Sequence, residues 1–255
     1  MVDTCVIPAA GKGSRWAPVS GYLPKEMLPL IDKPVIEWVI QDATASGIKK
    51  IVIVINKQKE TIKDYLLNNQ KLTKKAKFEF VYQKKPLGVA HAIYLCKDAV
   101  GQKPFGLMMP DLPVISRVPA PKQLIKNFDG QSNLISLDKF PRTDLKLYGE
   151  CLLRAKNDWL FEISHFCPEN KKPHHPGSLR MSGQFIFTPK IFSAIKKLLD
   201  NPPTNELTDR DALREALKQG QPCLGVQIQG HTYNTGTPKA YVRANTAFFK
   251  KFKMS

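Results

Sequence analysis

Glycines and cations with the spacing of a phosphate-binding loop lie near the start of the chain. A short apolar run precedes Gly11 and Gly13, Arg15 follows two residues later, and Lys25 lies between two prolines. Glycine lets backbone N–H groups approach a ligand, and bare N–H groups beside fixed cations suit a polyphosphate. The stretch 7–30 is therefore a candidate nucleotide site, although short Gly-x-Gly spacings are equally common in solvated loops.

Three polar side chains further along the chain follow predicted strands. They are Gln83, Asp111 and Asn234. Because the carboxyl ends of parallel strands meet at one edge of a sheet, we expect these side chains beside the glycine loop. A carboxylate that faces a phosphate loop is a suitable ligand for Mg²⁺, which prefers hard oxygen ligands.

Taken one at a time, these residues have ordinary structural meanings. Asp111 in M-P-D-L-P suits a turn, Gln83 suits an exposed strand end, and His91 suits a helix histidine with satisfied hydrogen bonds. No serine or cysteine nucleophile has an evident base partner, so a Ser/His/Asp or Cys/His site is not indicated. A nucleotide site requires that the fold bring these residues together.

The first half of the chain alternates strand and helix patterns. The expected elements are a helix at 34–47, a strand at 51–55, a helix at 61–72, a strand at 78–82, a helix at 87–96 that begins at Gly88, and a strand at 105–109. This order predicts βαβ units. The expected fold class is α/β and Rossmann-like, with a mostly parallel central sheet flanked by helices.

The second half is less regular. Strands are expected at 134–137, 149–154, 183–187 and 224–228, and helices at 191–199, after a Thr208 cap, and at 238–252. A loop rich in Pro, His, Lys and Asn spans 167–177. Without a repeat or an evident linker, we expect a single domain over 1–255, whose second half forms the other wall of a cleft.

Composition limits the functional classes. The formal net charge is +17 with a pI of about 9.7, which predicts attraction to anions. The lysines are spread over many segments and form no aromatic-interleaved stripe, so a nucleic-acid partner is not favoured. No apolar run is long enough for a membrane span and no signal segment is evident, so the expected location is cytoplasmic.

The cysteines give no sign of a metal or redox site. The five are scattered, odd in number, and mostly inside apolar runs, and no pair has metal-ligand or redox-motif spacing. We therefore expect reduced thiols that serve the packing of the core.

Several motifs together resemble the sugar-1-phosphate nucleotidylyltransferase family. A-A-G-K-G-S-R is followed by P-K-E-M-L-P-L-I-D-K-P, a form most similar to the bacterial UTP–glucose-1-phosphate uridylyltransferases. The resemblance continues through A-S-G-I-K-K-I-V-I-V, Q-K-K-P-L-G-V-A-H-A and M-P-D, and then thins to Y-G, G-Q-F-I-F, E-L-T-D and N-T-G-T-P. It spans nearly the whole chain and is most specific in the first 111 residues.

The resemblance implies a nucleotidyltransferase (glycosyltransferase-A-like) fold and a reaction of UTP with glucose 1-phosphate that gives UDP-glucose and pyrophosphate. Nucleotide binding is implied for Ala9, Ala10, Gly11, Gly13, Glu26, Gln83 and Gly88. Catalysis is implied for Arg15 and Lys25, which would neutralise phosphates, and for Asp111, which would hold Mg²⁺. Sugar contacts are implied for Gly149 and Glu206.

The resemblance also implies how the chain is divided and assembled. Residues 1–115 would form the nucleotide-binding half, and 116–255 the sugar-binding half with the C-terminal helix. Members of this family generally form dimers or tetramers, so a homo-oligomer is expected.

Two departures from the family pattern concern the sugar half. Relatives carry an E-K-P tripeptide, whereas this chain reads E-I-S-H-F-C-P-E-N-K-K-P, and spacing does not choose among Glu162, Glu169, Lys171 and Lys172 as substitutes. Many relatives also have a late metal-binding carboxylate where this chain has Asn234, a neutral ligand that disfavours a second metal contact.

These departures leave two alternatives to an active uridylyltransferase. One is a catalytically impaired paralogue that binds nucleotide sugars and regulates an active enzyme. The other is a nucleotidylyltransferase that uses another sugar 1-phosphate.

Overall fold

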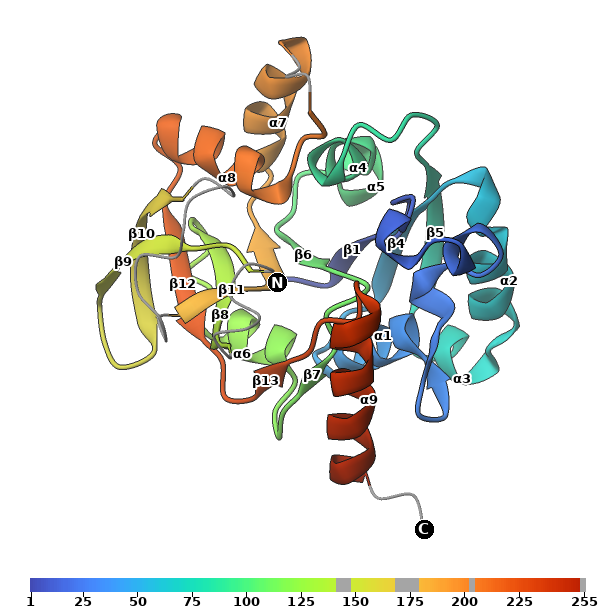
Figure 1. Cartoon of the computed structure of the whole chain (residues 1–255). Coiled ribbons are helices and arrows are strands. Elements are labelled where there is room, and N and C mark those ends of the chain that lie inside the picture. The colour runs from blue at the N-terminus through green and yellow to red at the C-terminus, as the bar shows by residue number, and fades with distance from the viewer. Residues whose placement is uncertain (141–147, 168–178, 202–204, 253–255) are drawn as a thin grey trace.

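One mixed sheet runs through both halves of the chain in the computed structural model, which describes residues 1–140, 148–167, 179–201 and 205–252 (Figure 1). Its strand order is β5-β4-β1-β6-β11-β8-β12-β10-β9. The strands are β1 (Thr4–Pro8), β4 (Lys50–Ile55), β5 (Lys77–Tyr82), β6 (Phe105–Met108), β8 (Asn133–Lys139), β9 (Cys151–Ala155), β10 (Leu160–Phe166), β11 (Leu179–Phe187) and β12 (Cys223–Gln227).

The strand directions agree with the predicted fold class. β1 pairs in parallel with β4 and β6, β4 with β5, and β8 with β12. β11 and β10 pair antiparallel with their neighbours, so all other strands of this sheet run in one direction. The expected Rossmann-like, mostly parallel sheet flanked by helices is confirmed.

The βαβ units of the first half form where the sequence predicted them. The helices are α1 (Val35–Ala45), α2 (Glu60–Asn68), α3 (Gln70–Thr73), α4 (Val89–Leu95) and α5 (Lys97–Val100). The helix predicted at 61–72 is two helices, because the Asn69 side chain accepts a hydrogen bond from the Leu72 N–H and caps a new turn.

The sheet is covered by helices on both faces. Val52 and Val54 of β4 belong to the apolar cluster that contains residues of α4, α7 (Ile191–Asp200) and α8 (Asp209–Lys218). Ile51, Ile53 and Ile55 belong to the cluster with α1, α2 and α6 (Ala120–Lys126). A strand that is apolar on both faces is typical of a buried parallel sheet, which explains its continuous β-branched sequence.

The second half contains elements that the sequence did not reveal. These are β10, α6 and a small sheet of β7 (Val114–Ile115) with β13 (His231–Thr232). A register shift between Ile163 and His165 interrupts β10, so its side chains do not alternate as a simple strand pattern requires. The predicted cap at Thr208 is confirmed as a capping box with Asp211. Of the predicted loop at 167–177, all but the first residue lies outside the described residues.

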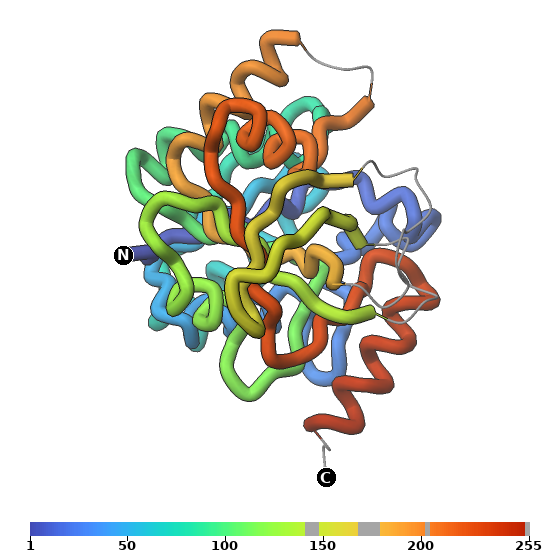
Figure 2. Tube along the Cα trace, turned by 90° about the vertical axis from the view of Figure 1, so that its left-hand side faces the viewer, coloured from blue at the N-terminus to red at the C-terminus, as the bar shows by residue number. Residues whose placement is uncertain are grey.

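The C-terminal helix α9 (Pro238–Phe252) packs against the first half of the chain. It runs down the outside of the molecule in both views (Figures 1 and 2). Phe248 contacts Trp38 edge to face with ring centroids 4.9 Å apart, and the Tyr241 hydroxyl donates to the carbonyl of Pro29 in the short hairpin of β2 (Pro29–Leu30) and β3 (Lys33–Pro34). The last helix therefore ties the end of the chain to its beginning. Within the part of the chain that the structure describes, no helix has the length and apolar character that a membrane crossing requires.

The cysteines are buried thiols, as the sequence predicted. All five are buried, and none of them forms a disulfide. Burial raises the pKa of the thiols of Cys96, Cys151 and Cys223 to about 12, so these groups stay protonated at neutral pH.

We expect the folded protein to react slowly with Ellman's reagent at pH 8, because all five thiols are buried and the thiolate, the reactive form, is disfavoured at Cys96, Cys151 and Cys223. Absorbance at 412 nm should rise quickly to the full five thiols only after denaturant is added. Rapid stoichiometric labelling of the folded chain would contradict the burial of these side chains.

Candidate active site

A cavity of about 280 Å³ lies at the carboxyl ends of β1, β5 and β6. It gathers most of the residues that the sequence singled out. Its lining includes Ala10, Gly11, Gly13, Arg15, Lys25, Glu26, Gln83, Gly88, Asp111 and Glu206. Gln83 and Asp111 thus lie beside the glycine loop as expected, whereas Asn234 does not line the cavity and follows β13, which is not a strand of the main sheet.

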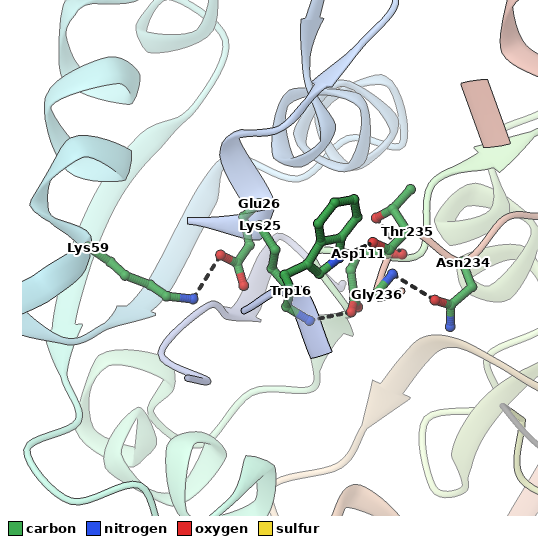
Figure 3. Close-up of polar contacts among 8 residues, drawn as sticks. All are labelled: Trp16, Lys25, Glu26, Lys59, Asp111, Asn234, Thr235 and Gly236. Carbon is green, nitrogen blue, oxygen red and sulfur yellow. Dashed lines mark hydrogen bonds and ion pairs between the residues drawn. The ribbon is translucent and has the colours of Figure 1, made fainter. Parts of the chain in front are cut away.

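Three of the singled-out residues do not line this cavity. Ala9 is buried in the apolar core, and its N–H donates to the carbonyl of Val54. Gly149 is buried elsewhere, where an added Cβ would lie 2.9 Å from both Arg210 and Met181. Asn234 lies next to the lining residue Gly236, whose N–H donates a hydrogen bond of 2.7 Å to the Asn234 Oδ1 (Figure 3).

The glycine loop is anchored at both ends. The Asn56 side chain donates to the carbonyl of Ala10 at 2.8 Å, which holds the end of β1 to the end of β4. Gly13 has φ of +68°, which favours glycine, and begins a 3₁₀ turn, η1 (Ser14–Trp16). The Trp16 indole N–H donates to the carbonyl of Thr235 at 3.0 Å. The loop therefore leaves β1 in a fixed direction and brings Arg15 to the cavity.

Lys25 and Asp111 form an ion pair inside the cavity (Figure 3). Burial disfavours the charge on Asp111, but Lys25 and Arg15 outweigh burial and hold the carboxyl pKa below its ordinary value. Burial likewise disfavours the charge on Lys25, but Asp111 and Glu26 hold the ammonium pKa above its ordinary value. Both groups are therefore charged at neutral pH.

Glu26, the residue after Lys25, forms a second ion pair, and its side chain points away from Asp111 (Figure 3). Its Oε2 lies 2.8 Å from the Lys59 ammonium, and the two side chains are 1% and 7% exposed (Figure 3). Lys59 follows β4 on the 3₁₀ turn η4 (Lys57–Lys59). Because Lys25 and Glu26 share one 3₁₀ turn, η3 (Lys25–Met27), the two pairs fix that turn between the ends of β6 and β4.

A segment from the second half closes the cavity beside Gly88. The Leu207 N–H donates to the carbonyl of Leu87 at 3.0 Å, and the Ala90 N–H donates to the carbonyl of Leu207 at 3.1 Å. Gly88 has φ of +98°, and an added Cβ would lie 2.2 Å from the Leu207 oxygen. Only glycine fits there, and the contact brings Glu206 to the cavity.

The wall beside Asp111 has room for a cation. Asp111 accepts hydrogen bonds at its carbonyl from the N–H and hydroxyl of Thr235, at 2.9 and 3.1 Å. An added Cβ on Gly236 would lie 2.9 Å from Asp111 Oδ2 and 3.1 Å from Asn234 Oδ1, so the glycine leaves open a space that a side chain would fill beside these oxygens.

Among the described residues, no three His, Cys, Asp or Glu side chains could hold a metal by themselves. One ionised carboxylate beside an open space fits Mg²⁺, which is often held by one or two carboxylates together with substrate phosphates and water.

The substitutes considered for the missing E-K-P tripeptide are not in this cavity as far as the structure describes them. Glu162 lies on β10 and forms an ion pair with Arg154. Glu169, Lys171 and Lys172 lie outside the described residues. The described cavity is therefore lined by the residues singled out near the glycine loop and by none of these substitutes.

Sequence reasoning missed residues that act through main-chain or buried contacts. Lys59 is one cation in a run of lysines, so nothing in its local sequence marks it as buried. Leu207 contributes through its backbone, which leaves no compositional signal. Gly236 was within reach of the sequence, because the quoted N-T-G-T-P motif contains it.

We expect Lys59→Met to destabilise the protein by roughly 3 kcal/mol, because it leaves the buried Glu26 carboxylate without its counter-charge. Urea denaturation without nucleotide would measure this. The double variant Glu26→Leu/Lys59→Met should recover much of the loss. Lys196→Met, at an exposed lysine 2.8 Å from the exposed Asp200, is the control and should not change the midpoint measurably. A Lys59→Met protein as stable as the original would show that the pair does not fix this turn.

Comparison with known proteins agrees with the geometry. A UTP–glucose-1-phosphate uridylyltransferase of Staphylococcus epidermidis is 29% identical, over 98% of this chain and 93% of its own length. The UTP–glucose-1-phosphate uridylyltransferase YngB of Bacillus subtilis is 27% identical, over 96% of this chain and 89% of its own length. A crystal structure of a UDP-glucose pyrophosphorylase complexed with UDP-glucose matches with a TM-score of 0.89 at 28% identity, covering 98% of this chain and 100% of that chain.

The family profile described as "Nucleotidyl transferase" matches residues 4–251, nearly the entire chain. The match includes both the glycine loop after β1 and the N-T-G-T-P segment that closes the cavity. The resemblance inferred from the motifs is confirmed, and the chain belongs to the nucleotidyl transferase family.

Proposed function

We propose that this protein transfers a uridylyl group from UTP to glucose 1-phosphate and forms UDP-glucose and pyrophosphate. One observation carries most of the support. A single cavity combines a glycine loop, Arg15, Lys25 and the ionised Asp111 with an amide at Gln83. A polyphosphate and a base can therefore be bound side by side. The names of the relatives at 27–29% identity favour UTP and glucose 1-phosphate.

In the proposed reaction, a phosphate oxygen of glucose 1-phosphate attacks the α-phosphorus of UTP. The new P–O bond forms as the bond to the β-phosphate oxygen breaks, and that oxygen leaves with pyrophosphate. This chemistry needs aligned reactants and neutralised charge more than a covalent intermediate. Backbone N–H groups at Gly11 and Gly13 would hold the triphosphate, and Arg15 would neutralise its β- and γ-phosphates.

Lys25 and Asp111 would exchange partners when substrates bind. Without nucleotide, they neutralise each other in the cavity. The phosphates that meet in the reaction would become the partners of the Lys25 ammonium, because they carry more negative charge than one carboxylate. Asp111 would then be free to hold a cation at the open side kept by Gly236. A bound Mg²⁺ would supply charge stabilisation on the transferring phosphoryl group.

The remaining assignments belong to the same proposal. Residues 1–115 would form the nucleotide-binding half and 116–255 the sugar-binding half. Glu206 would contact the sugar from the cavity wall. Gly149 is buried outside the cavity, so it would affect sugar binding through the residues that pack around it. The proposal includes a cytoplasmic location and a homo-oligomer, as in the family that the motifs resemble.

We expect purified protein with Mg²⁺ to release pyrophosphate from UTP only when a hexose 1-phosphate is present. A coupled phosphate assay that crosses four nucleoside triphosphates with several sugar 1-phosphates would measure this. The strongest signal should come from UTP with glucose 1-phosphate. Absence of release with every combination, together with calorimetric binding of UDP-glucose, would instead identify a nucleotide-sugar-binding paralogue.

We expect Lys25→Ala and Asp111→Ala each to lower kcat by roughly 100-fold or more, because each removes a charge aimed at the reacting phosphates. Steady-state pyrophosphate release would measure the loss. Lys103→Ala and Asp3→Ala are matched controls, because they remove the same residue types from an exposed pair 4.0 Å apart, outside the cavity lining. Near-normal turnover in either cavity variant would remove the proposed role of that residue.

A further inference from the structure

The Gln83 side-chain amide is held by two partners at the edge of the cavity. Its Nε2 lies 3.0 Å from the carbonyl oxygen of Gly88 and 2.9 Å from Nδ1 of His91. The residue is only 5% exposed, and its backbone N–H donates to the carbonyl of Ile55 at 2.9 Å. Both main chain and side chain of Gln83 are therefore fixed at the end of β5.

The chemistry of the partners determines which end of the amide faces them. A carbonyl oxygen can only accept, so the group opposite Gly88 must be the NH₂. The Gly88 carbonyl cannot turn away easily, because the Leu207 backbone packs against this glycine. The second amide hydrogen then points at His91, whose Nδ1 must accept it. Burial lowers the pKa of His91, which favours the neutral ring that has such an acceptor.

Both amide hydrogens are therefore used inside the protein. Among the described residues, no donor contacts the Gln83 Oε1, and Gln83 lines the cavity. The atom left for a ligand is a hydrogen-bond acceptor. An acceptor at this point pairs with a base that presents an N–H there, such as uracil at N3. It repels a base that presents a lone pair, such as cytosine at N3.

We propose that His91 is a positioning residue for base selection, because it holds Gln83 with Oε1 toward the nucleobase. This inference rests on the proposed function in that it places the base of the nucleotide beside Gln83. His91 does not line the cavity and acts only through the amide. Without the His91 acceptor, only the Gly88 carbonyl would oppose rotation of the Gln83 amide. The rotated amide would present its NH₂ group to the N3 atom of cytosine.

The test compares UTP with CTP in three variants at position 91. His91→Leu removes the acceptor. If the leucine variant does not fold, His91→Ala removes the acceptor without adding apolar bulk. His91→Asn keeps an acceptor, because an Asn Oδ1 can take the place of the imidazole Nδ1. Thermal melting without nucleotide establishes that each variant is folded.

We expect His91→Leu or His91→Ala to lower the UTP-to-CTP ratio of kcat/KM by about tenfold, which corresponds to the loss of about one hydrogen bond. The change should come from KM, since His91 is not at the reacting phosphorus. His91→Asn should restore the ratio to within about threefold of the original protein. A purely structural role for His91 would affect UTP and CTP equally.

Calorimetric titration with UTP and CTP gives the same ratio without turnover. It therefore tests His91 even if the original protein releases no pyrophosphate, an outcome that would overturn only the proposed function. An original protein that turns over UTP but binds UTP and CTP equally well would overturn the inference. An unchanged UTP-to-CTP ratio in His91→Leu and His91→Ala would overturn it too, while the proposed function stands.

Discussion

The ion pair between Lys25 and Asp111 is the interaction on which the geometry of the site depends. It joins two residues 86 positions apart and brings the turn after the glycine loop to the end of β6. Glu26, the next residue, is drawn to Lys59 at the end of β4. Since β1 lies between β4 and β6 in the sheet, the two pairs hold η3 across the end of β1. Burying a charge away from water costs free energy unless an opposite charge lies beside it. Each residue of a pair therefore holds its partner in position.

The parallel half of the sheet explains why these contacts are available. Parallel strands joined by helices place successive strand ends on one edge, and here the ends of β1, β5 and β6 face one cavity. The second half supplies the rest of the wall through backbone contacts. Leu207 packs on Gly88, and Thr235 hydrogen bonds to the carbonyl of Asp111 and to the Trp16 indole. The cavity is thus closed beside Gly88 and beside Asp111 by chain that lies far away in sequence.

Much of the first half could be predicted from the sequence, because its signals are local. The β-branched run of β4 and the helix expected at 34–47 are readable from adjacent residues, and the motifs around Lys25 and Asp111 contain the residue types themselves. The order of strands then dictates that these motifs share an edge. Prediction of the fold class needed no more than this.

Less of the second half could be predicted, because the contacts that determine its structure are not local in sequence. The register shift in β10 breaks the alternation of side chains, and Leu207 acts through its main chain. Lys59 looks like any surface lysine until the fold buries it against Glu26. The amide direction of Gln83 is set by a carbonyl five residues later and by one ring nitrogen, and no residue pattern encodes that.

In the proposed function, the cavity is a nucleotide site whose paired charges give way to substrate phosphates. A crystal structure of the protein with UTP and Mg²⁺ tests this most directly. We predict that the triphosphate lies over the N–H groups of Gly11 and Gly13, that the Lys25 ammonium contacts phosphate, and that Asp111 contacts the metal. A bound UTP that leaves the Lys25–Asp111 pair intact, or that lies outside this cavity, would contradict it.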